Sequence, residues 1–123
     1  MNIKENHTLY HIQFHLEQDK WITVGKHGTF LFEKGTYMYI GSAKRNIKAR
    51  IKRHLSKTKQ NRWHIDYVTQ YATNMSYETY DGENITECQL ATQLKSKWNG
   101  EVVVEKFGSS DCQCVSHFFK LSS

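Results

Sequence analysis

Apolar and polar residues alternate along the first third of the chain. In residues 8–16, every second side chain from Tyr10 to Leu16 is apolar or aromatic. This period of two is typical of a strand with one buried face. Three further short runs rich in β-branched and aromatic residues follow, at positions 21–24, 29–32 and 37–40. We therefore predict that the chain up to Gly41 forms an antiparallel meander, in which 21–24 is the second arm of a hairpin.

Later segments change to the spacing of three or four residues that aligns side chains along one face of a helix. The first two predicted helices carry apolar stripes at Ile47, Ile51 and Leu55 and, within residues 63–72, at Ile65, Val68 and Ala72. A third helix begins at Thr86, because Thr86 and Gln89 have the Thr-x-x-Gln spacing of a capping box. Its apolar stripe consists of Leu90, Ala91, Leu94 and Trp98.

Alternation returns in the second half of the chain and predicts further strands, at residues 74–80, 102–105 and 115–121. The expected fold is α+β, a small and mostly antiparallel sheet flanked by about three helices. The chain has 123 residues and no proline, and nothing in it marks a boundary or linker. We therefore expect one domain spanning residues 1–123.

Composition narrows the class of protein. No apolar run approaches the length of about 18 residues that a membrane span needs. The N-terminal segment is not of signal-peptide type, so we expect a cytoplasmic protein that does not contact a membrane. The odd number of cysteines, Cys88, Cys112 and Cys114, forms no spaced framework. We expect all three to be reduced.

The charge of the chain is concentrated in one block. The net charge is +5, and ten of the 17 Lys and Arg residues lie between Lys34 and Ile65, where no Asp or Glu occurs. Such a block favours binding to a polyanion, although a solvated helix face with a charge bias is the alternative. The candidate nucleic-acid-binding residues are Lys44, Arg45, Lys48, Lys52, Arg53 and His64.

Three side chains stand out as candidates for chemistry. Arg50 and His54 are four positions apart on the basic helix, at the margin of its apolar stripe. Glu87 lies in the middle of the apolar face of the third helix, where a carboxylate is unfavourable unless it is paired or bound to a cation. The alternative is that Glu87 stays solvated and interacts with the helix dipole.

The order of these residues resembles the GIY-YIG nuclease superfamily. Tyr39-Ile40-Gly41 is followed by Arg50 and then by His54. The first motif of the superfamily, Gly-Ile-Tyr, corresponds to Thr8-Leu9-Tyr10, in which only the tyrosine is kept, and its later glutamate to Glu87. The chain is most similar to a small prokaryotic branch that occurs alone or fused to endonuclease III-type repair enzymes. The signature of that branch is carried by residues 39–43, 63–67, Glu87 with Ala91, and 107–118.

The resemblance implies metal-dependent cleavage of phosphodiester bonds, with DNA as the substrate and a repair protein as a partner. Glu87 would bind one Mg²⁺ or Mn²⁺ ion, and Arg50 would hold the phosphate. Tyr10 or Tyr39 would deprotonate or orient the attacking water, which requires Arg50 or the metal to lower a tyrosine pKa. His54 would act as a second acid–base group or contact a phosphate.

Each of these residues also has a purely structural interpretation. Tyr10 and Tyr39 fit plain strand aromatics, His54 a polar residue of the basic helix, and His64 with Asp66 a brace for the second helix. For the whole chain the alternatives are a non-catalytic nucleic-acid-binding module and a structural domain that serves a repair enzyme. RNA as the ligand, and the oligomeric state, stay open.

The cysteines of the tail suggest a second site. Cys112, Cys114 and His117 have the residue types of a zinc site, but structural zinc needs a fourth ligand and wider cysteine spacing. Buried thiols that pack the tail against the sheet are the alternative.

Overall fold

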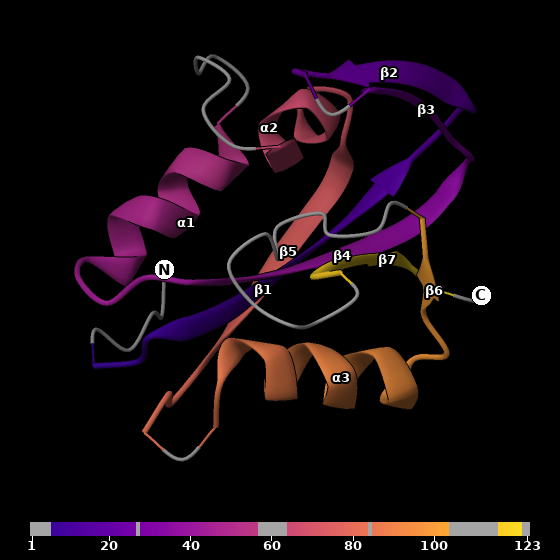
Figure 1. The fold of residues 1–123 in the computed structure, drawn as a ribbon. Coiled ribbons are helices and arrows are strands. Elements are labelled where there is room, and N and C mark those ends of the chain that lie inside the picture. Colours follow the sequence, from indigo (N-terminus) through magenta and orange to yellow (C-terminus); the bar gives the residue numbers. More distant parts are fainter. Residues whose placement is uncertain (1–5, 27, 57–63, 84, 104–115, 122–123) are drawn as a thin grey trace.

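The computed structural model describes residues 6–26, 28–56, 64–83, 85–103 and 116–121. Within them, seven strands and three helices follow one another along the chain (Figure 1). In chain order they are β1 Leu9–Leu16, β2 Lys20–Val24, β3 Gly28–Phe32, β4 Gly35–Ser42, α1 Ile47–Leu55, α2 His64–Thr69, β5 Thr73–Tyr80, α3 Glu87–Lys97, β6 Glu101–Val102 and β7 Phe118–Lys120. The predicted α+β class is confirmed.

The main sheet has five strands in the order β5-β1-β4-β7-β6, and every neighbouring pair is antiparallel. Strands β1 and β4 pair over their full lengths, from Leu9 opposite Ser42 to Leu16 opposite Gly35. Residues that are distant in the sequence, such as Tyr10 and Gly41, are thereby brought opposite each other. This pair of strands therefore places the two tyrosine motifs side by side.

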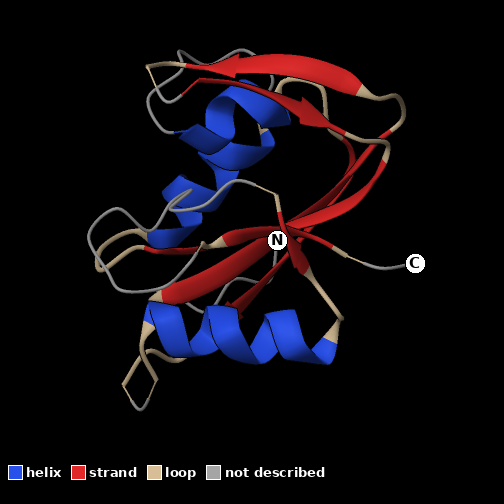
Figure 2. Ribbon diagram, turned by 45° about the vertical axis from the view of Figure 1, so that its right-hand side comes forward, coloured by secondary structure: helices blue, strands red, loops and turns tan. Residues whose placement is uncertain are grey.

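The predicted meander that ends at Gly41 is wrong, although its four strands are present. Strand β2 pairs with β3 in a separate two-stranded sheet, and β1 pairs instead with β4 and β5. The hairpin β2–β3 lies over one face of the main sheet and buries Ile22, Val24 and Phe32 against it (Figure 2). A strand with one apolar face can bury that face by packing on a sheet as well as by pairing within it.

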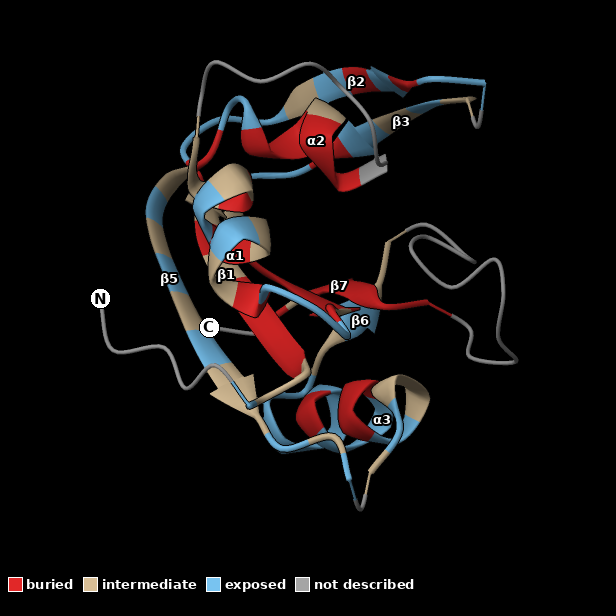
Figure 3. Ribbon diagram, turned by 90° about the vertical axis from the view of Figure 1, so that its left-hand side faces the viewer, coloured by how far each residue is buried: buried red, intermediate tan, exposed pale blue. Residues whose placement is uncertain are grey.

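Both faces of the main sheet are covered. Helices α1 and α2 and the β2–β3 hairpin pack on one face, around Tyr10, Phe14 and Phe118. Helix α3 covers the other face through Leu90 and Leu94 (Figures 1 and 3). Strand β1 was predicted to be half-buried, but part of its second face is also buried. Leu9 is 4% exposed and packs with α3, and His11 is 8% exposed, whereas Gln13 and His15 are only partly buried.

The predicted helices are confirmed with shorter ends. Helix α2 stops at Thr69, before the predicted end at residue 72, and Trp63 lies outside the described residues. Helix α3 begins with the predicted capping box, in which the Thr86 hydroxyl accepts from the Gln89 amide at 3.1 Å and the Gln89 side chain accepts from the Thr86 amide at 2.9 Å. Trp98 does not join the apolar stripe, because it ends the helix and is 45% exposed.

Both predicted tail strands, 102–105 and 115–121, are present in part. Strands β6 and β7 cover Glu101–Val102 and Phe118–Lys120, and residues 104–115 lie outside the described residues. Over the described portion of the chain, we find no helix with the length and hydropathy needed to traverse a lipid bilayer.

Candidate active site

The two tyrosines of the sequence motifs lie on the same face of the sheet, near the end of β1 and β4. Tyr10 stands opposite Gly41, and Tyr39 precedes Gly41 by two positions on β4. A Cβ atom on Gly41 would collide with the ring and hydroxyl of Tyr10. Glycine at position 41 therefore allows the Tyr10 ring to lie against the β4 backbone.

His54 binds the Tyr10 hydroxyl. The Tyr10 oxygen and His54 Nε2 are 2.7 Å apart, and both residues are only 1% exposed. The His54 ring also lies 5.8 Å from the Tyr39 ring, centroid to centroid. In the tautomer with its proton on Nδ1, His54 Nε2 accepts a hydrogen bond from the Tyr10 hydroxyl. His54 was predicted at the margin of the apolar stripe, whereas the last turn of α1 carries it into the core.

Arg50 lies one helical turn before His54 and connects α1 to the end of β4. Its Nη1 donates to the Ser42 carbonyl oxygen at 3.0 Å. Its positive charge favours the ionised forms of both tyrosines and of Glu87. Arg50 thereby opposes the rise in pKa that burial causes in each of these groups. Arg50 is half-buried. Its guanidinium group is the positive charge that acts on all three of these candidate side chains.

Burial dominates the acidity of the tyrosines. It raises the pKa of Tyr10 and of Tyr39 well above the ordinary value of 10, and the opposing effect of Arg50 is smaller. The expected lowering of a tyrosine pKa by Arg50 is therefore outweighed. Both phenols are neutral at pH 7, and Tyr10 enters any proton transfer as a donor to His54, not as a phenolate.

Glu87 approaches the site from the other side of the sheet. It is the first residue of α3, its side chain is 31% exposed, and its pKa is raised by burial. The Ser42 hydroxyl and the Arg50 charge oppose this shift without cancelling it. The prediction of a carboxylate within the apolar face is therefore half correct, because Glu87 lies at the helix end, where solvent still reaches it.

The chemistry of this carboxylate suits a divalent cation. Its raised pKa means that the surroundings leave its negative charge incompletely compensated, and a hard cation would supply the missing compensation. Mg²⁺ and Mn²⁺ take oxygen ligands, and Mg²⁺ keeps several waters, so one or two protein ligands suffice. Glu87 is the ligand that the described residues offer here.

His117 is a site residue that sequence reasoning considered only for zinc. It is 1% exposed, and its Nδ1 lies 3.7 Å from Glu87 Oε1. Its carbonyl oxygen accepts from the Ile40 amide at 2.9 Å, which fixes it beside β4. The only signal in the sequence was its place in the branch signature, because His117 and Glu87 are too far apart along the chain for any local pattern to relate them.

The cysteine predictions have different outcomes. Cys88 is disulfide-bonded, so the expectation that it is reduced is wrong. Its Sγ lies 3.5 Å from His117 Nε2. Cys112 and Cys114 lie outside the described residues, which leaves the zinc hypothesis a prediction. Among the residues that the structure does describe, no group of three or more His, Cys, Asp or Glu is arranged to hold a metal.

The basic residues divide into two groups. Lys44, Arg45 and Lys52 are exposed, and Lys48 is half-buried. Arg53 instead makes a bidentate ion pair with the fully buried Asp66 of α2, at 3.0 and 2.9 Å. This pair joins α1 to α2, as the bracing role suggested for Asp66 requires. His64, the remaining candidate, is the first residue of α2.

The comparisons with known proteins give one match. No curated protein and no solved structure matches the chain. The model of one protein family, described as "Domain of unknown function DUF123", matches residues 9–123. This match begins at the first residue of β1 and includes every candidate residue of the site. Because it covers nearly the whole chain, the protein belongs to the DUF123 family.

Proposed function

We propose that this protein is a GIY-YIG-type endonuclease that hydrolyses phosphodiester bonds of DNA with the help of Mg²⁺ or Mn²⁺. The observation that carries the proposal is the convergence of side chains from four separate elements at one end of β1 and β4. Five residues take part in it, namely Tyr10, Tyr39, Arg50, His54 and Glu87. An acid–base pair, a phosphate-binding cation and a carboxylate are the groups that such a reaction needs.

Each residue has a defined role in this proposal. Arg50 binds the scissile phosphate and offsets the charge that develops on it. Tyr10 orients the attacking water and takes its proton while passing the phenolic proton to His54 Nε2. The water oxygen forms the new bond to phosphorus, and the bond to the leaving oxygen breaks. Glu87 would hold the divalent cation, which would supply Lewis-acid stabilisation of the charge on that leaving oxygen.

The exposed cations of α1 and the turn before it supply the contact to the rest of the substrate. Lys44, Arg45 and Lys52 belong to the segment that carries Arg50 and His54. Contacts of lysine and arginine to phosphates orient a nucleic acid without reading its sequence. We therefore propose binding with little sequence specificity, and a branched or damaged DNA as the preferred substrate.

The test is nicking of supercoiled plasmid in Mg²⁺ or Mn²⁺ by the wild type and by Glu87→Gln. We expect the variant to lose about 100-fold or more of the activity, because removal of one electrostatic catalytic group has that effect. Glutamine keeps the shape, and the raised pKa of Glu87 shows that burial already favours the neutral form. We therefore expect the variant to stay folded, and a thermal melt checks this. A loss of nicking by the folded variant then reports on catalysis.

Glu83→Gln is the matched control, because it removes the same charge from an exposed side chain in the loop before α3. It should nick at the wild-type rate. Equal nicking by Glu87→Gln and the wild type would contradict the metal role, and equal loss in both variants would point to a general charge effect.

A second candidate function is a non-catalytic nucleic-acid-binding module. The raised pKa of both tyrosines favours it, since neither phenol is prepared to act as a base by itself. This candidate predicts that the wild type does not nick in either metal, while DNA affinity falls steeply with salt. Binding would then be weakened by Lys44→Ala or Arg45→Ala and left intact by Glu87→Gln.

A further inference from the structure

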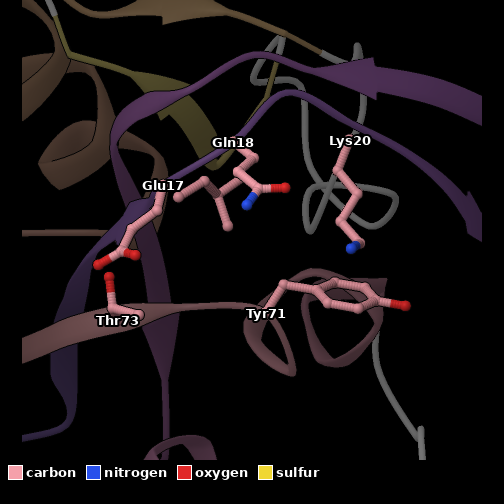
Figure 4. A pocket seen from close by; sticks show the side chains of 6 residues that line it. Glu17, Gln18, Lys20, Tyr71 and Thr73 are labelled. Atoms are coloured by element: carbon pink, nitrogen blue, oxygen red, sulfur yellow. The ribbon is translucent and has the colours of Figure 1, made fainter.

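A surface hollow lies far from the candidate active site. It has a volume of about 210 Å³ and is lined by Leu16, Glu17, Gln18, Lys20, Tyr71 and Thr73 (Figure 4). Leu16 ends β1, and its side chain belongs to the core on the same face of the sheet as α1 and α2. The hollow is therefore at the opposite end of β1 from Tyr10, and the proposed catalytic residues do not reach it.

Tyr71 gives the hollow a flat aromatic wall. The residue follows α2 in a turn whose amide donates to the Val68 carbonyl at 3.1 Å, and it is 41% exposed. The next residue, Ala72, is buried in the core. The backbone beneath the ring is thus fixed while the ring itself faces solvent, so little conformational entropy is lost when another flat group stacks on it.

Polar groups surround this ring. Lys20 Nζ lies over the face of the Tyr71 ring, 4.4 Å from the ring centroid, and Figure 4 shows the two side chains facing each other. Gln18 extends into the space beside Lys20, while Glu17 points toward Thr73. The hollow therefore combines a stacking surface, a cation, and an amide and a carboxylate that offer hydrogen-bond donors and acceptors.

An ordinary surface cation–π pair is the alternative explanation, and the chain contains one for comparison. Lys97 Nζ lies 5.4 Å from the ring centroid of Trp98, which is 45% exposed. That pair lies at the end of α3, on the opposite side of the sheet from α1. It has a similar exposure and the same charge, but neither Lys97 nor Trp98 belongs to the hollow at Tyr71.

We propose that the hollow binds one unpaired nucleobase of a single-stranded segment, stacked on Tyr71. The base takes the place of the Lys20 ammonium group over the ring, Lys20 contacts the adjacent phosphate, and Gln18 bonds to the edge of the base. Aromatic stacking together with nearby cations is the general mode by which proteins hold single strands. The proposal rests on nucleic-acid binding by this protein, as the proposed function does, but it does not require cleavage.

The position of the hollow defines the kind of substrate. Leu16 lies six positions after Tyr10 on β1, which corresponds to about 20 Å along a strand. This is the axial length of about six base steps of a duplex strand. A nucleic acid that followed β1 between the two sites would therefore have an unpaired base about six steps from the bond to be cut, as branched or frayed substrates have.

The test is the affinity of the full chain for a labelled single-stranded DNA of about 12 nucleotides, measured by fluorescence anisotropy. We expect Tyr71→Ala to weaken binding about 10-fold. Tyr71→Phe keeps the stacking surface and should bind within about twofold of the wild type. Trp98→Ala, the matched control, should bind as the wild type does. Thermal melts of the variants check that each is folded.

A probe of the same length without bases separates stacking from charge. With this abasic strand, we expect wild type and Tyr71→Ala to bind equally. No loss with Tyr71→Ala on the normal strand, an equal loss on the abasic strand, or an equal loss with Trp98→Ala would overturn the proposal. So would a wild type that does not bind the normal strand.

The binding assay and the plasmid-nicking assay together distinguish this proposal from the proposed function. If plasmid nicking is absent but Tyr71→Ala weakens single-strand binding, the nucleobase site stands and the catalytic proposal fails. If nicking depends on Glu87 while Tyr71→Ala binds normally, the catalytic proposal stands and the nucleobase site fails.

Discussion

The hydrogen bond between Tyr10 and His54 should be measurable as stability. In Tyr10→Phe the aromatic ring stays in place, and only the hydroxyl that lies 2.7 Å from His54 Nε2 is removed. Both residues are 1% exposed, so the hydrogen bond lies in a largely desolvated environment, where the loss of one partner is unfavourable. The variant therefore leaves one imidazole nitrogen in the core without its hydrogen bond from Tyr10.

The size of the effect follows from this burial. A buried polar group that loses its partner destabilises a protein by about 1–3 kcal/mol. The low exposure places Tyr10→Phe within that range, and we expect a loss of about 2 kcal/mol in the free energy of unfolding. For a chain of this length the melting temperature should fall by about 8 °C. Nicking of plasmid should fall as well, because the proposed proton transfer to His54 is interrupted.

The assay is urea denaturation followed by tryptophan fluorescence, with Tyr71→Phe as the control. That variant removes a hydroxyl from a ring that is 41% exposed, so its effect should be below about 0.5 kcal/mol. If Tyr10→Phe also loses less than about 0.5 kcal/mol, the hydroxyl and the imidazole are not bonded in solution, and the acid–base pair of the proposed mechanism is refuted.

Three further predictions concern other parts of the molecule. Asp66→Asn should destabilise the protein by about 3 kcal/mol in the same assay, because it breaks the buried ion pair with Arg53, and an unchanged unfolding midpoint would contradict the bracing role. His117→Asn should weaken Mn²⁺ binding about 10-fold or more, because it removes the imidazole beside Glu87. Electron paramagnetic resonance measures this affinity, and an unaltered value would exclude a role of His117 in positioning Glu87. Burial lowers the pKa of His11 below its ordinary value of 6.5, so the unfolded chain takes up a proton before the folded one does. Stability should therefore fall as the pH drops below about 6.5, and His11→Asn should lack this component in urea titrations between about pH 7 and pH 5.

Local features of the fold were readable from the sequence. The capping box of Thr86 and Gln89 and the alternation from Tyr10 to Leu16 were both predicted and are both present. Signals of this kind act within a few residues, because a helix cap is satisfied by its own first turn and a strand repeats its faces at every second position. The positions of Arg50, His54 and Glu87 on their helices were readable for the same reason, because they follow from local spacing.

Pairing and burial were not readable in this way. The period of β1 gives one apolar face, but β1 pairs with β4 and β5 and is covered on both sides. Which strand pairs with β1 depends on the sum of contacts across the whole sheet. A hairpin such as β2–β3 can bury its apolar face equally well by packing on the main sheet as by pairing within it.

The candidate site shows the same division. The sequence by itself determined that the chain is α+β and that Arg50 and His54 lie on one side of a helix. Only the tertiary structure decided that His54 meets Tyr10, that His117 lies beside Glu87, and that burial raises the pKa of both motif tyrosines. Side chains on one helix are related by local geometry, whereas contacts and desolvation depend on every element that packs around them.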